Sequence, residues 1–233
     1  MTTSADQISA LIASNTALKE FFEGERDALK QDRNNLPNLI FDHVYVDTVN
    51  GLPGNDGSFA EPFQTLEDAV LHFANGQVGL ISLLSDVVWD FRIYNFRRRI
   101  TLRGRASDNS ANQHRTVTFA DTGNGSASIA PGAGIDFGGV IFEDCDVVLS
   151  NLDLQTFRLF CIEEQWIALN SSSIDGTSGT TFLVDKYSGV AGIGMGSSTF
   201  TSMGGRWIRG FAAGVAIDPV SSGVLLSPNV DNT

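Results

Sequence analysis

The sequence predicts an all-β protein, a parallel β-solenoid that carries a short capping helix and follows an α-helical coiled-coil stem. Three observations support this fold class. The 233 residues include 24 glycines and only 6 prolines, with many Ser, Thr and Asn residues, which is typical of short strands joined by tight turns. A faint apolar repeat runs through the last third of the chain, and a long pattern with helical period opens it.

The stem is predicted from Ser4 to about Asn35. Ser4 followed by Gln7 matches a capping box, and Asn34, Asn35 and Pro37 indicate the end of the helix. A single heptad frame places the following residues at a and d positions: Ile8, Leu11, Asn15, Leu18, Phe22 and Leu29.

This heptad stripe favours self-association, because a lone solvated helix would leave its apolar side chains in water. Asn15 at an a position would set the register of a bundle, at a cost in stability. Glu25 and Asp32 at d positions weaken the second half of the seam. Docking of the stripe on the following domain, or on an unrelated partner, is the alternative.

The second segment, residues 37–76, predicts a strand, a polar loop and a short helix. His43–Asp47 alternates as a strand does, and Thr65 is placed to cap the helix, with Gly76 as its stop. Such a short helix is marginal alone, so its apolar stripe must cover an exposed apolar surface. That stripe consists of Leu66, Ala69, Val70 and Phe73.

The third segment, residues 77–233, contains the repeat. Val147–Leu154 aligns with Ile167–Ile174 and Ile193–Phe200, and a fourth copy begins at Val215. Each complete copy has apolar residues at its first, third and eighth positions, with small polar residues between them. Stacked coils need this pattern, because inward residues on two strands are separated by a bend. The unequal steps between copies fit a coil whose turns vary in length.

Earlier apolar runs extend the series less regularly: Gly79–Leu84, Val87–Tyr94, Ile100–Leu102, Val117–Phe119 and Ile135–Phe142. With about 22 residues in each coil, this segment would form about seven coils. A β-sandwich is the alternative, because it also contains short strands with turn signals. It does not predict the repeat.

The formal charge of -12 argues against nucleic-acid and membrane-surface partners, which require a clustered positive field. A local basic stretch nevertheless holds seven of the twelve arginines: Arg92, Arg97, Arg98, Arg99, Arg103, Arg105 and Arg115. Arginine pairs with carboxylates through two parallel hydrogen bonds, so a partner subunit or an acidic sugar would fit. Ion pairs with the protein's own acidic surface are the simpler interpretation.

The two cysteines, Cys145 and Cys161, form neither a disulfide framework nor a zinc signature, and we expect buried thiols. No apolar run approaches the length of a membrane span, and the first residues, MTTSADQISALIASN, lack the pattern of a cleaved signal. The sequence therefore predicts no membrane insertion.

No catalytic, nucleotide-binding or metal motif is present, so we expect no cofactor and no metal. The three histidines, His43, His72 and His114, lie in separate contexts. If the coils stack as aligned, Asp153 lies over Ser173 and beside the turn that carries Asp175. Asp153 and Asp175 are therefore the weak candidates for a catalytic carboxylate pair.

Contacts with a glycan or a partner would come from side chains of two kinds. Flat aromatic rings stack on sugar faces, although Trp89, Trp166, Tyr187 and Trp207 also suit a core. Arginines supply the polar contacts. The candidates are Arg97, Arg98, Arg99, Trp166 and Trp207.

The second segment also resembles a known family. Val44–Asp47, then Gly54–Ser58, Pro62–Leu66 and Ala69–Val70, are similar to the opening of the right-handed parallel β-helix, or pectate-lyase-like, domains of bacteriophage tail fibres and tailspikes. The resemblance implies that the helix after Thr65 caps the first coil. It also implies that Gly54, Asn55, Asp56 and Gly57 are structural turn residues. A cation held by Asp47, Asn55 and Asp56 is the alternative, but the ligands are too few.

The resemblance implies a function as well. Such fibres are usually homotrimers that attach to the virion by their N-termini, so residues 1–36 would be the attachment and trimerisation stem. We expect a virion structural protein, a short tail fibre or spike or a head fibre, that contacts other virion proteins and host surface polysaccharide. A polysaccharide-degrading tailspike enzyme, a glycosidase or lyase on the same fold, is the rival.

Overall fold

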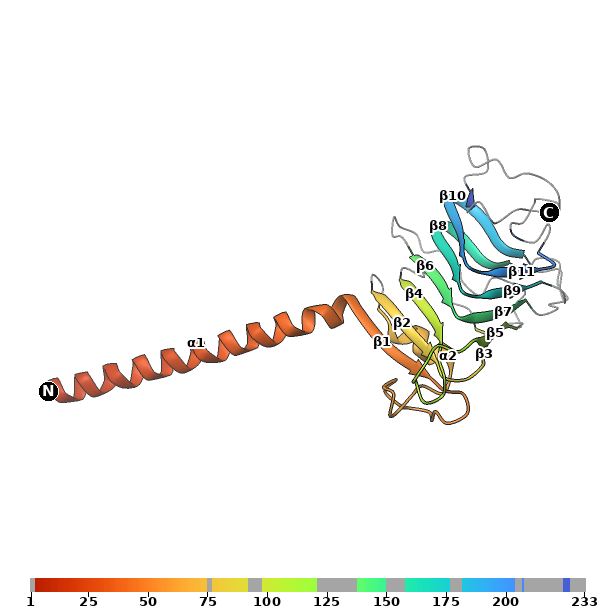
Figure 1. The fold of residues 1–233 in the computed structure, drawn as a ribbon. Coiled ribbons are helices and arrows are strands. Elements are labelled where there is room, and N and C mark those ends of the chain that lie inside the picture. The colour runs from red at the N-terminus through yellow and green to blue at the C-terminus, as the bar shows by residue number, and fades with distance from the viewer. Residues whose placement is uncertain are drawn as a thin grey trace. The chain divides into compact units, whose positions relative to one another are not determined.

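The structure is a computed structural model, and it describes residues 3–74, 77–91, 98–120, 138–149, 158–176, 182–203, 207 and 224–226. The chain divides into two compact units, Met1–Ile40 and Phe41–Thr233. The first unit contains helix α1, and the second is mainly β with one short helix, α2 (Figure 1). No helix in the described part of the chain is long and apolar enough to span a membrane.

Helix α1 spans Ser4–Ile40, so it passes through the predicted stop at Asn34, Asn35 and Pro37. Asparagine costs only a fraction of a kcal/mol in a helix, about 0.7 or less, and two asparagines do not end one by themselves. The helix ends where the chain enters strand pairing at Phe41.

The apolar side chains of α1 that the structure describes face solvent. Ile8, Leu11, Leu18 and Phe22 are each more than half exposed, and Asn15 is exposed on the same helix. The side chain of Leu29 lies outside the described residues. Since exposed apolar surface is costly in water, α1 by itself leaves a stripe without a partner.

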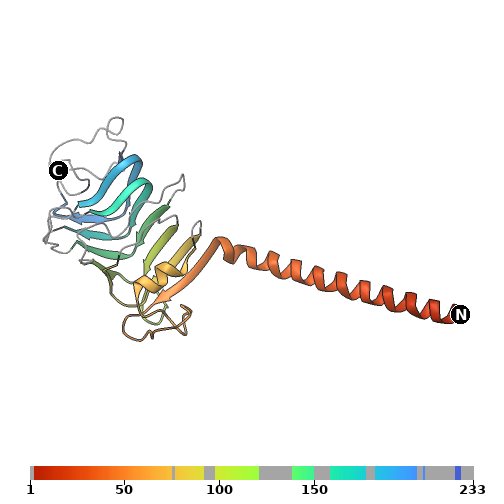
Figure 2. The ribbon, with the colours of Figure 1, turned by 180° about the vertical axis from the view of Figure 1, so that it is seen from behind.

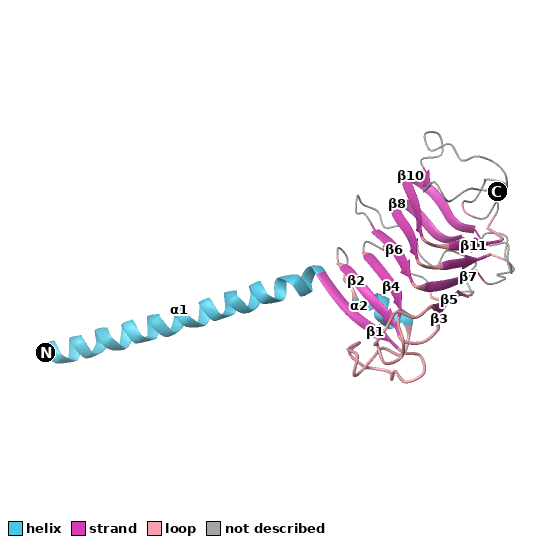
Figure 3. Ribbon diagram, in the orientation of Figure 1, coloured by secondary structure: helices cyan, strands magenta, loops and turns pink. Residues whose placement is uncertain are grey.

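Two parallel sheets form the second unit (Figure 3). The seven-stranded sheet contains, in spatial order, β1 (Phe41–Val46), β2 (Val78–Leu83), β4 (Arg99–Gly104), β6 (Gly138–Glu143), β8 (Arg158–Asn170), β10 (Phe182–Gly196) and β12 (Val224–Leu226). The five-stranded sheet contains β3 (Val87–Trp89), β5 (Arg115–Phe119), β7 (Cys145–Leu149), β9 (Ser173–Asp175) and β11 (Thr199–Thr201). From β2 to β11 the described strands alternate between the two sheets in chain order.

The strand register confirms the alignment of the second and third predicted copies. Ile167 pairs with Ile193 between β8 and β10, and Ile174 pairs with Phe200 between β9 and β11. The fourth predicted copy, which begins at Val215, lies outside the described residues.

The alignment of the first copy is wrong by seven residues. Val147 pairs with Ile174, and the residue paired with Ile167 is Val140. The error has a simple cause: a run that begins at Val140 also has apolar residues at its first, third and eighth positions. Phe142 occupies the third of these positions and is buried.

The core lies between the two sheets and is built from rows of stacked side chains. One row contributes an apolar residue from each of five neighbouring strands: Ile81, Leu102, Phe142, Leu169 and Met195. Burial of each such side chain contributes about 1.5–3 kcal/mol. On the five-stranded sheet, aromatic side chains contribute to the core near the N-terminal end. There the ring of Trp89 stacks on the ring of Phe119, with ring centroids 5.3 Å apart.

Helix α2 spans Leu66–His72 and lies next to β1 at the N-terminal end of the sheet (Figure 2). The Thr65 side chain accepts a hydrogen bond from the Asp68 backbone N–H at 3.1 Å, so the predicted N-cap is confirmed. Gly76, the predicted stop, lies outside the described residues. The predicted apolar stripe is buried throughout, at Leu66, Ala69, Val70 and Phe73.

The loop of residues 51–64 covers the free edge of β1. Tyr45 N–H donates to Gly57 O at 2.8 Å, Phe63 N–H donates to Tyr45 O at 2.9 Å, and Asp47 N–H donates to Phe63 O at 3.0 Å. An open edge strand is a template for pairing with another chain, so the loop removes that hazard. Gly57 has a φ of 83°, which favours glycine, and a side chain there would collide with the Phe63 ring.

A recurring corner joins a strand of the seven-stranded sheet to the next strand of the five-stranded sheet. At three of these corners a non-glycine residue has positive φ, namely Asp144, Ser171 and Ser197. At the last two, the serine after this residue accepts a backbone N–H from the preceding corner. Ser172 Oγ accepts from Cys145 N–H at 3.1 Å, and Ser198 Oγ accepts from Ser172 N–H at 3.1 Å.

We expect Ser172→Ala to lower the free energy of unfolding by about 1–3 kcal/mol, because it leaves the buried Cys145 N–H without an acceptor. Cys145→Ser should retain stability, since serine occupies the equivalent position at the next two corners. Urea denaturation of both variants measures the difference. Equal stability of Ser172→Ala and the unmodified protein would contradict the structural role of the corner.

Candidate functional site

The structure describes the side chains of three of the five predicted contact residues. Trp207 is fully buried, with its ring edge against Phe200 at 5.5 Å, so it belongs to the core and is not on the surface as expected. Arg98 Nη1 donates to Val70 O at 2.7 Å and fastens α2. Arg99 is exposed on β4, whereas Arg97 and the side chain of Trp166 lie outside the described residues.

The predicted stacking of Asp153 over Ser173 is wrong. Asp146 is the residue that pairs with Ser173 from β7, and Asp175 pairs with Val148. This error follows from the seven-residue shift of the first repeat. Asp153 itself lies outside the described residues.

Asp146 instead contacts two polar side chains, and all three lie on the outer face of the five-stranded sheet. Its Oδ1 accepts from Ser173 Oγ at 2.7 Å and lies 3.1 Å from His114 Nδ1. Burial favours the neutral form, but the hydrogen bonds from Ser173 and His114 hold the pKa of Asp146 below its ordinary value. The serine bonds the carboxylate rather than the imidazole, so this is not the arrangement of an activated nucleophile.

A cluster of three aromatic side chains lies at the N-terminal end of the unit, and we call it the aromatic cluster: His43, Tyr45 and Phe59. The rings of His43 and Tyr45 are 4.5 Å apart, and those of Tyr45 and Phe59 are 5.4 Å apart, edge to face. Phe59 is 46% exposed, whereas His43 and Tyr45 are half-buried. The cluster therefore presents one accessible ring on a supported base.

A hairpin of residues 105–112 reaches this aromatic cluster, and we call it the Arg105 hairpin. Asn109, at its tip, has a φ of 58° and donates from Nδ2 to the Tyr45 hydroxyl at 3.2 Å. Arg105 donates to Asn109 Oδ1, Asn109 O and Asn112 Oδ1 and so keeps the hairpin closed. The tip is therefore fixed beside Tyr45 by side chains rather than by apolar packing.

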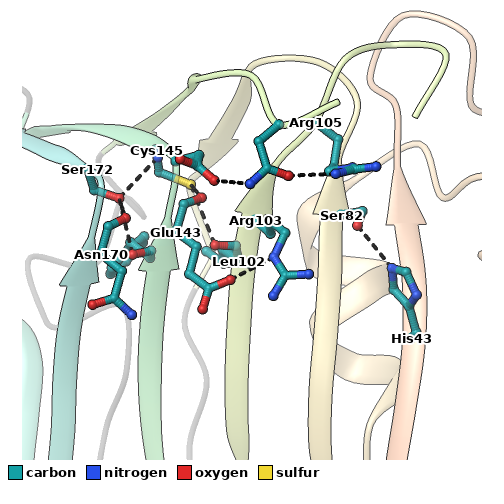
Figure 4. A network of polar contacts seen from close by, with 12 residues as sticks. His43, Ser82, Leu102, Arg103, Arg105, Glu143, Cys145, Asn170 and Ser172 are labelled. Atoms are coloured by element: carbon teal, nitrogen blue, oxygen red, sulfur yellow. Dashed lines mark hydrogen bonds and ion pairs between the residues drawn. The ribbon is translucent and has the colours of Figure 1, made fainter. Parts of the chain in front are cut away.

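A ladder of polar contacts continues across neighbouring strands of the seven-stranded sheet (Figure 4). His43 Nε2 lies 2.9 Å from Ser82 Oγ, and Arg103 Nε lies 2.6 Å from Glu143 Oε2. Burial, followed by the charge of Arg103, lowers the pKa of His43 below its ordinary value. His43 is therefore neutral at physiological pH.

Of three described arginines of the basic stretch, one forms the predicted ion pair with the protein's own acids and two bond neutral groups of the chain. Arg103 pairs with Glu143, and Arg105 bonds the hairpin. Arg115 Nε donates to Arg105 O at 2.8 Å. These guanidinium groups serve the protein's own structure.

The oxygen ligands considered for a cation serve the loop instead. Asp47 Oδ1 accepts from Val49 N–H at 2.9 Å and from Asn50 N–H at 3.1 Å. Asn55 Nδ2 donates to Pro62 O, and Asp56 Oδ1 accepts from Ser58 N–H. Within the described residues no group of three or more His, Cys, Asp or Glu side chains could hold a metal ion.

Sequence reasoning missed the pairing of the aromatic cluster with the Arg105 hairpin. One signal was available: residues 105–114 lie between β4 and β5, whereas the connections from β6 to β7, β8 to β9 and β10 to β11 are only a few residues long. Long loops on a regular scaffold often carry function. No family model, curated protein or solved structure matches this chain.

Proposed function

We propose that this chain is a structural protein of a bacteriophage particle, a short homotrimeric tail fibre or spike or a head fibre. Its body is a right-handed parallel β-helix that binds host surface polysaccharide. Its N-terminal helix trimerises and attaches to other virion proteins.

The observation that carries the proposal is the exposed apolar stripe of α1, directly ahead of a stack of parallel strands. Leu11 and Phe22 are 62% and 61% exposed, values that fit a helix whose partner is another copy. A coiled-coil stem joined to a β-rich body is the organisation that the resemblance to phage fibres implies.

The strand order supports the β-helix body. Described strands alternate between two parallel sheets, and each strand pairs with the next strand of its own sheet. A chain that winds as one coil after another produces this order. Parallel crossovers are almost always right-handed, which supports the right-handed form.

Two further features support the proposed solenoid, because they cover its N-terminal end. The loop of residues 51–64 covers the β1 edge, and α2 buries Leu66 and Val70 at the N-terminal end. Solenoids need such caps because a terminal coil exposes an apolar bore and unpaired backbone groups. In this proposal the Thr65-capped helix is the lid of the first coil.

Immunogold electron microscopy tests the location of the protein. Antibody raised against the full chain should decorate a fibre on the tail or head of phage particles that carry this gene. Antibody adsorbed beforehand with the purified chain is the control and should leave the particles bare. If the chain were found only outside particles, the virion assignment would be wrong.

A further inference from the structure

We propose that the aromatic cluster and the tip of the Arg105 hairpin form a binding site for an uncharged saccharide, which stacks one sugar face on the ring of Phe59. This inference rests on the proposed function, and it assigns a place and a substrate class to the glycan contact. It differs from the sequence-based expectation, which placed the contact at arginines and tryptophans.

The exposed ring of Phe59 is the first observation that supports a stacking site. Phe59 exposes 46% of its surface, and its ring meets that of Tyr45 edge to face at 5.4 Å. Tyr45 is held from two sides, by the His43 ring at 4.5 Å and by the Asn109 side chain at its hydroxyl. A ring on a fixed base loses little conformational freedom on binding, which favours stacking of a flat, partly apolar ligand.

The tip of the Arg105 hairpin, which bonds Tyr45 through Asn109, is polar. Ser107, Asp108 and Ser110 are exposed at the hairpin tip. Asp108 Oδ1 accepts from Ser110 N–H at 3.0 Å and from Ser110 Oγ at 2.6 Å. Hydroxyl and carboxylate groups on the hairpin that bonds Tyr45 suit the hydroxyls of a pyranose, and the Phe59 ring suits its C–H face.

The charges decide between a neutral and an acidic saccharide. The Arg103 guanidinium pairs with Glu143, and the three nitrogens of Arg105 bond acceptors in its own hairpin. Hydrogen bonds from Ser110 lower the pKa of Asp108, so its exposed carboxylate is ionised at neutral pH. His43 is neutral. The tip would therefore repel a carboxylate-bearing sugar.

Binding of the labelled full-length protein to immobilised neutral, acidic and amino oligosaccharides tests this site. We expect neutral oligosaccharides to bind, with little change between about 0.05 and about 0.5 M salt, because no ion pair forms. Phe59→Ala should weaken this binding at least about tenfold, and Phe59→Tyr should retain it because the ring remains. Val49→Ala is the matched control, since Val49 is 77% exposed near the same loop.

The possible results of this experiment distinguish an error in the Phe59 site from an error in the proposed glycan-binding function. Glycan binding that survives Phe59→Ala, or that is confined to acidic sugars, would overturn this site and leave the glycan-binding function in place. Absence of binding to every class would overturn both the site and the glycan-binding part of the proposed function. Equal loss in Phe59→Ala and Val49→Ala would also count against stacking on Phe59.

Discussion

The double substitution Leu18→Glu with Phe22→Glu should dissociate the proposed trimer of the full-length protein to a monomer of 25.0 kDa. Both side chains are more than half exposed on an isolated α1, and in a trimer each copy would bury them. The variant loses about 1.5–3 kcal/mol of burial for each side chain in each copy, and it places ionised carboxylates in the seam. Multi-angle light scattering measures the mass.

Ala13→Glu with Ala17→Glu is the matched control, because both positions lie on the opposite side of the heptad frame. This variant should keep the oligomer, with the same gain in negative charge. Circular dichroism should show an unchanged β signal in both variants. If the unmodified protein had the mass of a monomer, the stem interpretation of residues 1–36 would be refuted.

Gly104→Ala should destabilise the second unit by more than about 3 kcal/mol. Gly104 ends β4 and is buried, and an added Cβ would collide with the backbone carbonyl oxygens of Asp144 and Gln113. Backbone atoms from two segments cannot withdraw without breaking the Arg105 hairpin or the corner before Cys145. Urea denaturation followed by tryptophan fluorescence measures the loss.

Gly196→Ala is the matched control, because Gly196 also ends a strand of the seven-stranded sheet. There an added Cβ would meet only the Asn170 side-chain oxygen, at 2.9 Å, and that side chain can rotate away. We expect a cost below about 1 kcal/mol. Similar losses at the two glycines would contradict the close backbone approach at Gly104.

Local signals in the sequence predicted the second segment well. Thr65 lies before an apolar stripe of helical period, and both the cap and the buried face of α2 are confirmed. The information lies within a few residues, because the cap bonds Asp68 N–H three positions away. The end of α1 was predicted too early, since strand pairing rather than local propensity sets it.

The register of the strands was harder to predict than the presence of an apolar sequence repeat. The stacking of Ile167 on Ile193 is confirmed, but Val147 was matched one run too far along the chain. Apolar spacing is the same in the two adjacent runs, so the pattern alone does not distinguish them. Cross-strand hydrogen bonds make the distinction, and the misplaced Asp153–Asp175 pair followed directly from the wrong choice.

The sequence by itself determined the β class of the second unit, the short helix after Thr65 and the apolar stripe of α1, because periodicity and helix N-capping are local properties of a chain. The tertiary structure alone decided which residues share a surface. Asn109 meets Tyr45 across 64 positions, and Trp207 is buried rather than exposed. Such contacts depend on how the strands stack and where an inserted hairpin folds, so the pairing of Tyr45 with Asn109 of the Arg105 hairpin is not encoded in neighbouring residues.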